Sequence, residues 1–398
     1  MMGPTHGTMR IALIHYWLLG SRGGEKVLEA ICRIFPEAEI FTLFYDAEKV
    51  SPVIRSRKVH PSYLNPLKRF HRSLLPLMPM ALEDLDLRGY DLVISSESGP
   101  AKGVLVSAAA IHVCYCHTPM RYLWELYPDY RNDYSKGALF RAAFSPFASY
   151  LRTWDFAAAA RVDAFVANSL NTRRRIRRTW RRRSRVVYPP VAVESFETGP
   201  SEGYSLMVSE MVAYKQLDYA IRLFSRTGRR LKVVGDGPEY RSLRRSAGRT
   251  VEFCGRATDA ELRRLYAHSD ALIVPGEEDF GITMVESLAS GKPVIGLGRG
   301  GALEIVGDRY GFLYPEATEE GLEQALRRFE RDPYALTADD LSQRASRYSE
   351  TAFSRRFLRT LSKSLPARFS MEQRIELTAN IDDGCRDYFG LALERAGK

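Results

Sequence analysis

The fold is indicated most directly by the stretch ALIVPGEEDFGITMVESLASGKPVIG, residues 271–296. Residues 271–274 form a short apolar run that predicts a buried strand, and residues 294–296 predict the next one. Residues 287–290 predict a helix, which the Gly291-Lys292-Pro293 turn ends. A strand followed by a turn and a helix leaves backbone N–H groups free at the helix start, where an anion can bind.

Two carboxylates, Glu278 and Glu286, stand eight positions apart in this stretch. We expect Glu278 in the loop before the helix and Glu286 about two turns into it, since a helix rises about 1.5 Å per residue. One carboxylate can then reach one end of an extended ligand and the second the other end, with backbone amides between them. This arrangement suits a sugar, a diphosphate and a ribose laid in a row.

The rest of the chain alternates short apolar runs with longer mixed segments, the pattern of a parallel sheet covered by helices. We expect strands at residues 11–15, 40–44, 92–95, 112–116 and 164–167, and a second set at residues 204–208, 231–234, 251–254, 271–274 and 294–296. The Tyr188-Pro189-Pro190 segment between the two sets cannot continue a helix or a central strand, so it predicts a hinge.

The predicted fold is therefore α/β, with two Rossmann-like domains facing a cleft that holds the ligand. The first domain is expected at residues 1–187, with residues 346–398 crossing back to it, and the second at residues 188–345. A length of 398 residues agrees with two domains because it exceeds one ordinary core.

Composition narrows the class of protein. A net charge of +10 favours anionic partners. The five scattered cysteines indicate reduced thiols, and we expect Cys114 and Cys116 to be core thiols, not metal ligands. No apolar run approaches the roughly 18 to 20 residues of a membrane span. The first apolar run lacks a cleavage site, so no signal peptide is expected.

Several residues of both domains lie at expected strand ends. Gly23 and Gly24 open a helix and let the backbone approach a bulky ligand, unless the turn is purely structural. His117 follows the fourth strand, where the alternative is a packed, hydrogen-bonded histidine. Lys215 should open a helix after the first strand of the second domain and neutralise a phosphate there, unless it is simply solvated.

Two segments are rich in basic residues. Residues 173–185 hold nine arginines, and residues 68–80 mix basic with apolar residues. No aromatic stacking platform or helix-turn-helix pattern accompanies the arginines, which disfavours nucleic acid. The alternatives are a solvated helix face or a contact with anionic lipid for the arginines, and an interfacial segment or a capped core helix for residues 68–80.

Taken together, the motifs resemble those of the retaining GT-B glycosyltransferases that carry an E-x7-E motif. Within that group they are similar to bacterial mannosyltransferases that build O-antigen and related polysaccharides. The resemblance covers about residues 9–365. Its carriers are His15-Tyr16-Trp17, Gly23-Gly24-Glu25-Lys26, Cys116-His117-Thr118-Pro119-Met120-Arg121-Tyr122, Asn168-Ser169, Tyr214-Lys215 and the stretch from Glu278 to Glu286.

The resemblance implies a role for each candidate residue. His117 and Glu278 would be the catalytic residues, both at the transferred sugar. Lys215 would neutralise the donor diphosphate, and Glu286 would take the ribose hydroxyls. The other donor-binding residues would act through their backbone: Gly23, Gly24, Phe280, Gly281, Ile282 and Thr283.

One position departs from the family pattern. Many relatives have an arginine a few residues before the lysine, as a second cation for the diphosphate. In this chain Glu210 stands there. Arg256 and Arg299 are the candidate substitutes, since a carboxylate repels phosphate.

The resemblance further implies transfer of a hexose, mannose from GDP-mannose, onto a lipid-linked or polysaccharide acceptor. The protein would be cytoplasmic and peripheral at an anionic inner membrane face. We expect no metal or other cofactor, because no Asp-x-Asp stands at a strand end; the nearest match is Asp84-Leu85-Asp86. The alternatives are a UDP-sugar donor, a non-catalytic protein that binds nucleotide sugars or polyanions, and, third, nucleic-acid binding.

Overall fold

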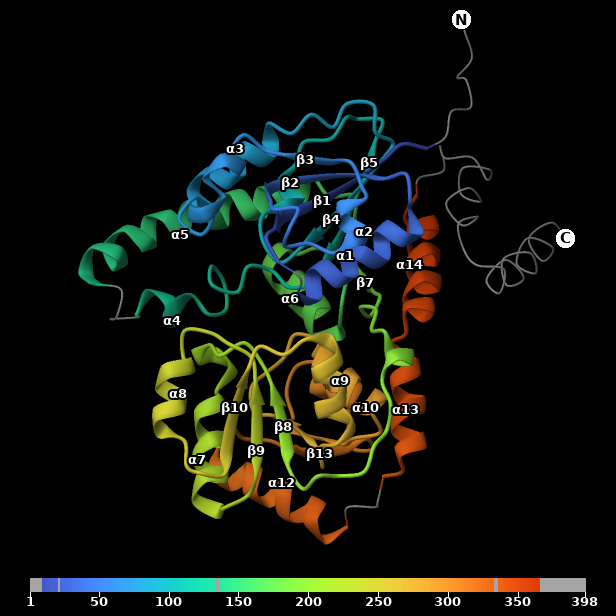
Figure 1. Ribbon diagram of the computed structural model, residues 1–398. Helices are drawn as coiled ribbons and strands as arrows, with labels where there is room; N and C mark the ends of the chain where they lie inside the picture. Colours follow the sequence, from blue (N-terminus) through green and yellow to red (C-terminus); the bar gives the residue numbers. More distant parts are fainter. Residues whose placement is uncertain (1–8, 21, 133–136, 333–335, 366–398) are drawn as a thin grey trace, which may run out of the picture. The chain divides into compact units, whose positions relative to one another are not determined.

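The computed structural model describes residues 9–20, 22–132, 137–332 and 336–365 (Figure 1). The chain divides into two compact α/β units, each built on a parallel sheet. The first unit runs to Tyr188 and resumes at Phe353, and the second runs from Pro189 to Ala352. The return to the first unit thus begins later than the expected residue 346. The cleft expected between the domains stays a prediction.

The first unit holds a seven-stranded sheet in the order β3-β2-β1-β4-β5-β6-β7. Its strands are β1 (Ile11–Leu18), β2 (Glu39–Tyr45), β3 (Val59–Pro61), β4 (Leu92–Glu97), β5 (Ile111–Cys116), β6 (Ala164–Ala167) and β7 (Ser184–Val186). Its helices are α1 (Gly23–Ile34), α2 (Pro52–Arg55), α3 (Met78–Glu83), α4 (Tyr127–Arg131), α5 (Gly137–Ala160), α6 (Leu170–Trp180) and, from Phe353 onward, α14 (Glu350–Ser364).

Helices cover both faces of this sheet, which explains why its central strands are almost continuously apolar. Successive side chains of β1 point to opposite faces of the sheet and pack in two different apolar clusters. Leu13 packs in a cluster with residues of α1 and α14, whereas Ala12 and Ile14 pack in a cluster with residues of α3. In α14, Phe353 and Phe357 stack at 5.3 Å, so the returning helix is part of the first unit's core.

The second unit holds a six-stranded sheet in the order β10-β9-β8-β11-β12-β13. Its strands are β8 (Ser205–Val208), β9 (Leu231–Val234), β10 (Val251–Gly255), β11 (Leu272–Val274), β12 (Val294–Leu297) and β13 (Gly311–Tyr314). Its helices are α7 (Leu217–Thr227), α8 (Tyr240–Ser246), α9 (Asp259–Ala267), α10 (Ile282–Ala289), α11 (Ala302–Ile305), α12 (Glu319–Arg331) and α13 (Ala338–Ser346). In both sheets the strand order reverses at the first strand of the unit, which is where doubly wound folds bind ligands.

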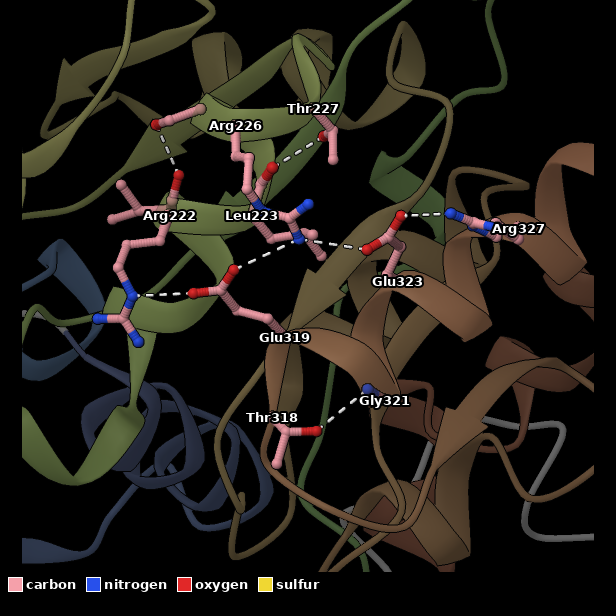
Figure 2. Close-up of polar contacts among 11 residues, drawn as sticks. Arg222, Leu223, Arg226, Thr227, Thr318, Glu319, Gly321, Glu323 and Arg327 are labelled. Atoms are coloured by element: carbon pink, nitrogen blue, oxygen red, sulfur yellow. Dashed lines mark hydrogen bonds and ion pairs between the residues drawn. The ribbon is translucent and has the colours of Figure 1, made fainter.

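A surface network of ion pairs joins α7 to α12, as Figure 2 shows. Arg222 contacts Glu319 at 2.9 Å, and Arg226 contacts Glu323 at 3.2 Å. Arg327 of α12 also binds Glu323, at 2.7 Å. Each exposed pair contributes about 1 kcal/mol or less. The apolar cores beneath the helices therefore supply most of the stability of this unit.

Candidate active site

In the first unit, the side chains of His15, Ser96 and His117 lie near one another, where β1, β4 and β5 are neighbouring strands. Parallel pairing places His15 of β1 opposite Ser96 of β4, and Ser96 opposite Tyr115 of β5. His117 follows directly after β5, as expected. Its imidazole Nε2 lies 2.9 Å from the Ser96 hydroxyl, and its carbonyl accepts a hydrogen bond of 3.0 Å from Thr172. The strand register therefore fixes where the His117 ring lies.

Gly24 lies next to the rings of His15 and His117. Helix α1 begins at Gly23, as expected. A Cβ atom added to Gly24 would lie 3.6 Å from His15 Cε1 and 3.7 Å from His117 Nε2. Any larger side chain at this position would extend into contact with the two rings. The structure thus brings Gly24 and His117 together and adds His15, to which the sequence analysis gave no role of its own.

Both imidazoles are held neutral. Burial, and then the neighbouring His15, lowers the pKa of His117 to about 3. Burial lowers the pKa of His15 to about 4. A neutral imidazole donates one hydrogen bond and accepts one. At neutral pH neither ring therefore adds positive charge for a phosphate, and His117 can bind a hydroxyl group.

In the second unit, Lys215 and Glu278 form an ion pair. Lys215 Nζ lies 2.5 Å from Glu278 Oε2, and the two side chains are only 15% and 19% exposed. Lys215 ends a 3₁₀ turn, Ala213–Lys215, and α7 begins two residues later. The expectation that Lys215 opens a helix is therefore wrong. The lysine instead lies in the turn between β8 and α7, at the carboxyl edge of the sheet.

The loop that carries Glu278 is pressed onto the Lys215 turn. A Cβ atom at Gly276 would lie 2.5 Å from the Lys215 carbonyl oxygen, closer than side chains tolerate. Only glycine permits this approach without a shift of the backbone. On the other side, the buried Tyr219 hydroxyl donates to the Pro275 carbonyl at 2.7 Å. These contacts hold the loop so that the carboxylate of Glu278 faces the lysine.

Helix α10 begins at Ile282, earlier than the expected residues 287–290. Gly281 precedes it with φ of +99°, a conformation that favours glycine, and Phe280 before it is buried. The first helical residues are Ile282 and Thr283. Their N–H groups have no carbonyl acceptor within the helix, because no helical turn precedes them. The amides of the predicted anion site therefore lie at a true helix N-terminus.

Glu286 is the fifth residue of α10, so it lies just over one turn into the helix. The sequence had predicted about two turns. Its side chain is buried, with the residue only 5% exposed. The Tyr266 hydroxyl of α9 donates to Glu286 Oε2 at 2.9 Å. Tyr266 could not be identified from the sequence, because nothing in its local pattern separates it from an ordinary core tyrosine.

The two arginines considered as substitutes for a second cation have other partners. The Arg256 guanidinium lies 3.2 Å from Asp236 Oδ2. The Arg299 guanidinium donates to the Pro315 carbonyl at 3.3 Å. A guanidinium has five N–H donors, so these contacts leave other donors of both groups available for a phosphate.

The basic segments differ from one another in the structure. Arg182 of the arginine run donates to main-chain carbonyls, including that of Ala159 at 2.7 Å, and Arg175 lies 3.0 Å from Glu125. In residues 68–80, Met78 is fully buried, whereas Phe70 and Met80 are 50% and 52% exposed. This second segment therefore packs against the core on one side and exposes apolar side chains on the other.

Three further expectations concern metals, thiols and membrane spans. Cys114 and Cys116 are buried free thiols, as expected. Within the described residues, no three His, Cys, Asp or Glu side chains gather in a way that suits a metal ion. Helices of the described ranges are all too short or too polar to cross a bilayer.

Family models match both units. Residues 22–195 match the model described as "Glycosyltransferase Family 4", and residues 193–351 match "Glycosyl transferases group 1". Together the two matches run through nearly all of both sheets. The fold, with its switch-point glycines, helix N-terminus and cation–carboxylate pair, defines a GT-B protein. The chain belongs to the glycosyltransferases, with a family 4 domain followed by a group 1 domain.

Curated relatives match over shorter stretches. The chain is 35% identical over 136 residues to a GDP-mannose-dependent alpha-mannosyltransferase of Mycobacterium tuberculosis, covering 33% of this chain and 36% of that protein. It is 28% identical over 159 residues to an uncharacterized glycosyltransferase of Methanocaldococcus jannaschii, covering 39% and 45%. The chain thus spans less than half the length of these relatives.

Solved structures resemble the chain over most of its length. HepE of Anabaena in complex with UDP is 17% identical with a TM-score of 0.66, covering 89% of this chain and all of that one. Sucrose-phosphate synthase of Thermosynechococcus elongatus is 16% identical with the same TM-score, covering 89% and 98%. At such low identity these likenesses establish the shared fold.

Proposed function

We propose that the protein is a retaining hexosyltransferase that moves mannose from GDP-mannose to a lipid-linked or polysaccharide acceptor. The observation that carries the proposal is the Lys215–Glu278 pair beside the N-terminus of α10. A cation, a carboxylate and free helix amides at one sheet edge can bind a sugar diphosphate. The same edge carries Glu286, one helical turn further on.

The choice of donor rests on sequence similarity. The relatives of Mycobacterium tuberculosis and Corynebacterium glutamicum, 35% and 32% identical over the matched stretches, are both GDP-mannose-dependent alpha-mannosyltransferases. Their product is α-linked, and an α-linked product from an α-linked donor is the retaining outcome. A UDP-sugar donor is the second candidate, because the HepE structures of the same fold contain UDP and UDP-glucose.

In the proposed reaction, the acceptor hydroxyl attacks the anomeric carbon from the face that the diphosphate leaves. The bond between this carbon and the β-phosphate oxygen breaks, and the hydroxyl proton passes to that oxygen. Lys215 and the amides of Ile282 and Thr283 stabilise the growing phosphate charge. His117, neutral at working pH, and Glu278 bind sugar hydroxyls and hold the ring in place.

We propose that this charge stabilisation needs no metal ion, since Lys215 supplies the cation. We also propose that the protein works at an anionic membrane face on the cytoplasmic side. The exposed apolar side chains of residues 67–80 and the exposed arginines of α6 support this location. Both features belong to the first unit, the one expected to receive the acceptor.

A thermal-shift screen against nucleotide sugars tests the proposal, because a ligand that binds only the folded state raises its melting temperature. GDP-mannose should give the largest shift, and Lys215→Met should reduce it. A larger shift with UDP-glucose would indicate a UDP-sugar as the donor in place of GDP-mannose. No shift with any nucleotide sugar would contradict the proposal, and a shift without later turnover would favour the non-catalytic binding protein.

A further inference from the structure

A buried tyrosine holds the second carboxylate of the candidate site. Tyr266 near the end of α9 is fully buried, and its hydroxyl donates to Glu286 Oε2 at 2.9 Å. Glu286 lies on α10, which packs beside α9 in the second unit (Figure 1). The hydrogen bond thus joins two neighbouring helices at the side chain expected to contact the donor.

The direction of this hydrogen bond is settled by the protonation state of the tyrosine. Burial, and then the adjacent carboxylate of Glu286, raises the pKa of Tyr266 well above its ordinary value. The hydroxyl therefore keeps its proton and donates a hydrogen bond to the carboxylate. A carboxylate this deeply buried is strongly unfavourable without hydrogen bonds. Tyr266 supplies one, while an ionised carboxylate can accept about four.

Packing keeps the tyrosine ring in place. The ring of Phe196 meets the Tyr266 ring edge-on, with centroids 5.8 Å apart. The Tyr266 carbonyl accepts a hydrogen bond of 3.0 Å from Ser269, which is itself buried. The ring contact and the hydrogen bond to the main chain both restrain Tyr266, so its hydroxyl can restrict the rotamers that Glu286 adopts.

We propose that Tyr266 is a positioning residue of the donor site, which orients the Glu286 carboxylate toward the ribose hydroxyls of the bound nucleotide. The inference rests on the proposed function, because it takes the ribose as the partner of Glu286. Tyr266 itself does not touch the donor. Its effect should appear in the recognition of the ribose, and not in the binding of the base or the phosphates.

The chain contains a matched control for the loss of a tyrosine hydroxyl. Tyr204 is also buried, and its hydroxyl donates at 2.9 Å to the carbonyl of Leu265, the residue before Tyr266. Tyr204→Phe removes a hydrogen bond of similar length to the same helix but leaves Glu286 alone. Tyr266→Phe keeps the ring and removes only the contact with the carboxylate.

The experiment is a calorimetric titration of the full chain with a nucleoside diphosphate and its 2′,3′-dideoxy analogue. GDP and UDP are both titrated, and the tighter one is used. The wild type should prefer the ribose form by about tenfold, the lower value for a hydrogen bond to a charged group. Tyr266→Phe should reduce this preference to about twofold and bind the dideoxy form like wild type. Tyr204→Phe should keep the wild-type preference.

Glu286→Gln separates the inference from the proposed function. If Glu286→Gln lowers the ribose preference while Tyr266→Phe keeps it, Tyr266 is a structural tyrosine and the inference is overturned, although the donor site stands. If Glu286→Gln also keeps it, or neither diphosphate binds, the proposed role of Glu286 fails and the inference fails with it. In the Glu286→Gln background, Tyr266→Phe should change the preference no further.

Discussion

Lys215 and Glu278, the two groups proposed to hold opposite ends of the sugar diphosphate, are bound to each other at 2.5 Å. They line a cavity of about 10 Å³ at the carboxyl ends of β8 and β11. In the proposed function the diphosphate of the donor would compete with Glu278 for the lysine. A diphosphate that takes over the lysine would release the carboxylate for the sugar hydroxyls.

Exchange of partners at Lys215 predicts an unusual effect of Glu278→Gln. The variant should lose most of its turnover, because a neutral amide is a weaker acceptor for sugar hydroxyls. It should nevertheless bind GDP about two- to fivefold more tightly, since the phosphate no longer competes with the ion pair; a fivefold change in affinity corresponds to about 1 kcal/mol. Calorimetric titration with GDP measures the affinity, with Glu277→Gln as the control. Weaker GDP binding than wild type would contradict the exchange.

Removal of divalent metals should leave transfer intact. Lys215 and the amides at the start of α10 can neutralise the leaving diphosphate. Initial rates with GDP-mannose are measured in excess chelator and again after Mg²⁺ or Mn²⁺ is restored. The expected rates agree within about twofold. Loss of activity in chelator that either metal reverses would show that the diphosphate needs a cation besides Lys215.

Acid should destabilise the first unit through its buried histidines. Burial lowers the pKa of His112 to about 3. Because this pKa lies below its unfolded value of about 6.5, the contribution of His112 is complete above pH 6.5 and falls as the pH drops toward 3. At pH 5 the loss is about 2 kcal/mol. All four tryptophans lie in the first unit, so their fluorescence reports its unfolding.

The difference in unfolding free energy between pH 7 and pH 5 should therefore be about 2 kcal/mol smaller in His112→Gln than in wild type. Comparison with wild type removes the contribution of the other titrating groups. His268→Gln, which changes a histidine of the second unit, should leave the difference unchanged. An unchanged difference in His112→Gln would mean that this imidazole is charged in the folded state.

Ten strands were predicted from apolar runs, and each appears in the structure. The predicted ends differ from the observed ends by a few residues at most. Three strands were missed: β3, β7 and β13. All three lie at sheet edges. The strands β3 and β7 are short and partly polar, so they lack the continuous apolar run that marks a central strand. The strand β13 does carry an apolar run, Phe312 to Tyr314, so its place at the edge does not explain why it was missed.

The candidate site was predictable in part. His117 and Gly24 were identified from motifs at strand ends, and the structure brings them together. The contacts of Ser96 with His117 and of Tyr266 with Glu286 were not predictable, because each joins residues that are far apart in the sequence and adjacent only through strand order or helix packing. Motif spacing locates a site, but tertiary packing decides which hydroxyls support it.

Membrane attachment should depend on the exposed apolar residues of the first unit. Phe70→Ser with Met80→Ser should weaken co-sedimentation with anionic vesicles, because burying half of a large apolar side chain contributes about 1 kcal/mol. Arg177→Ser with Arg178→Ser should reduce mainly the salt-sensitive part of vesicle binding, by about 1 kcal/mol of binding free energy for each charge removed. Tyr150→Ser, an exposed aromatic of α5, is the control. Equal binding to neutral and anionic vesicles, or to neither, would rule out the proposed surface.

Acceptor-dependent release of GDP from GDP-mannose tests the central claim most directly. The donor is incubated with the folded protein, with and without lipid-linked saccharides extracted from bacterial membranes, and free GDP is measured by a coupled assay. We predict release that requires the acceptor and falls at least about a hundredfold in Glu278→Gln, since each 1.4 kcal/mol of lost transition-state stabilisation lowers the rate tenfold. A wild-type protein that binds the donor but releases no nucleotide with any acceptor or nucleotide sugar would contradict the account.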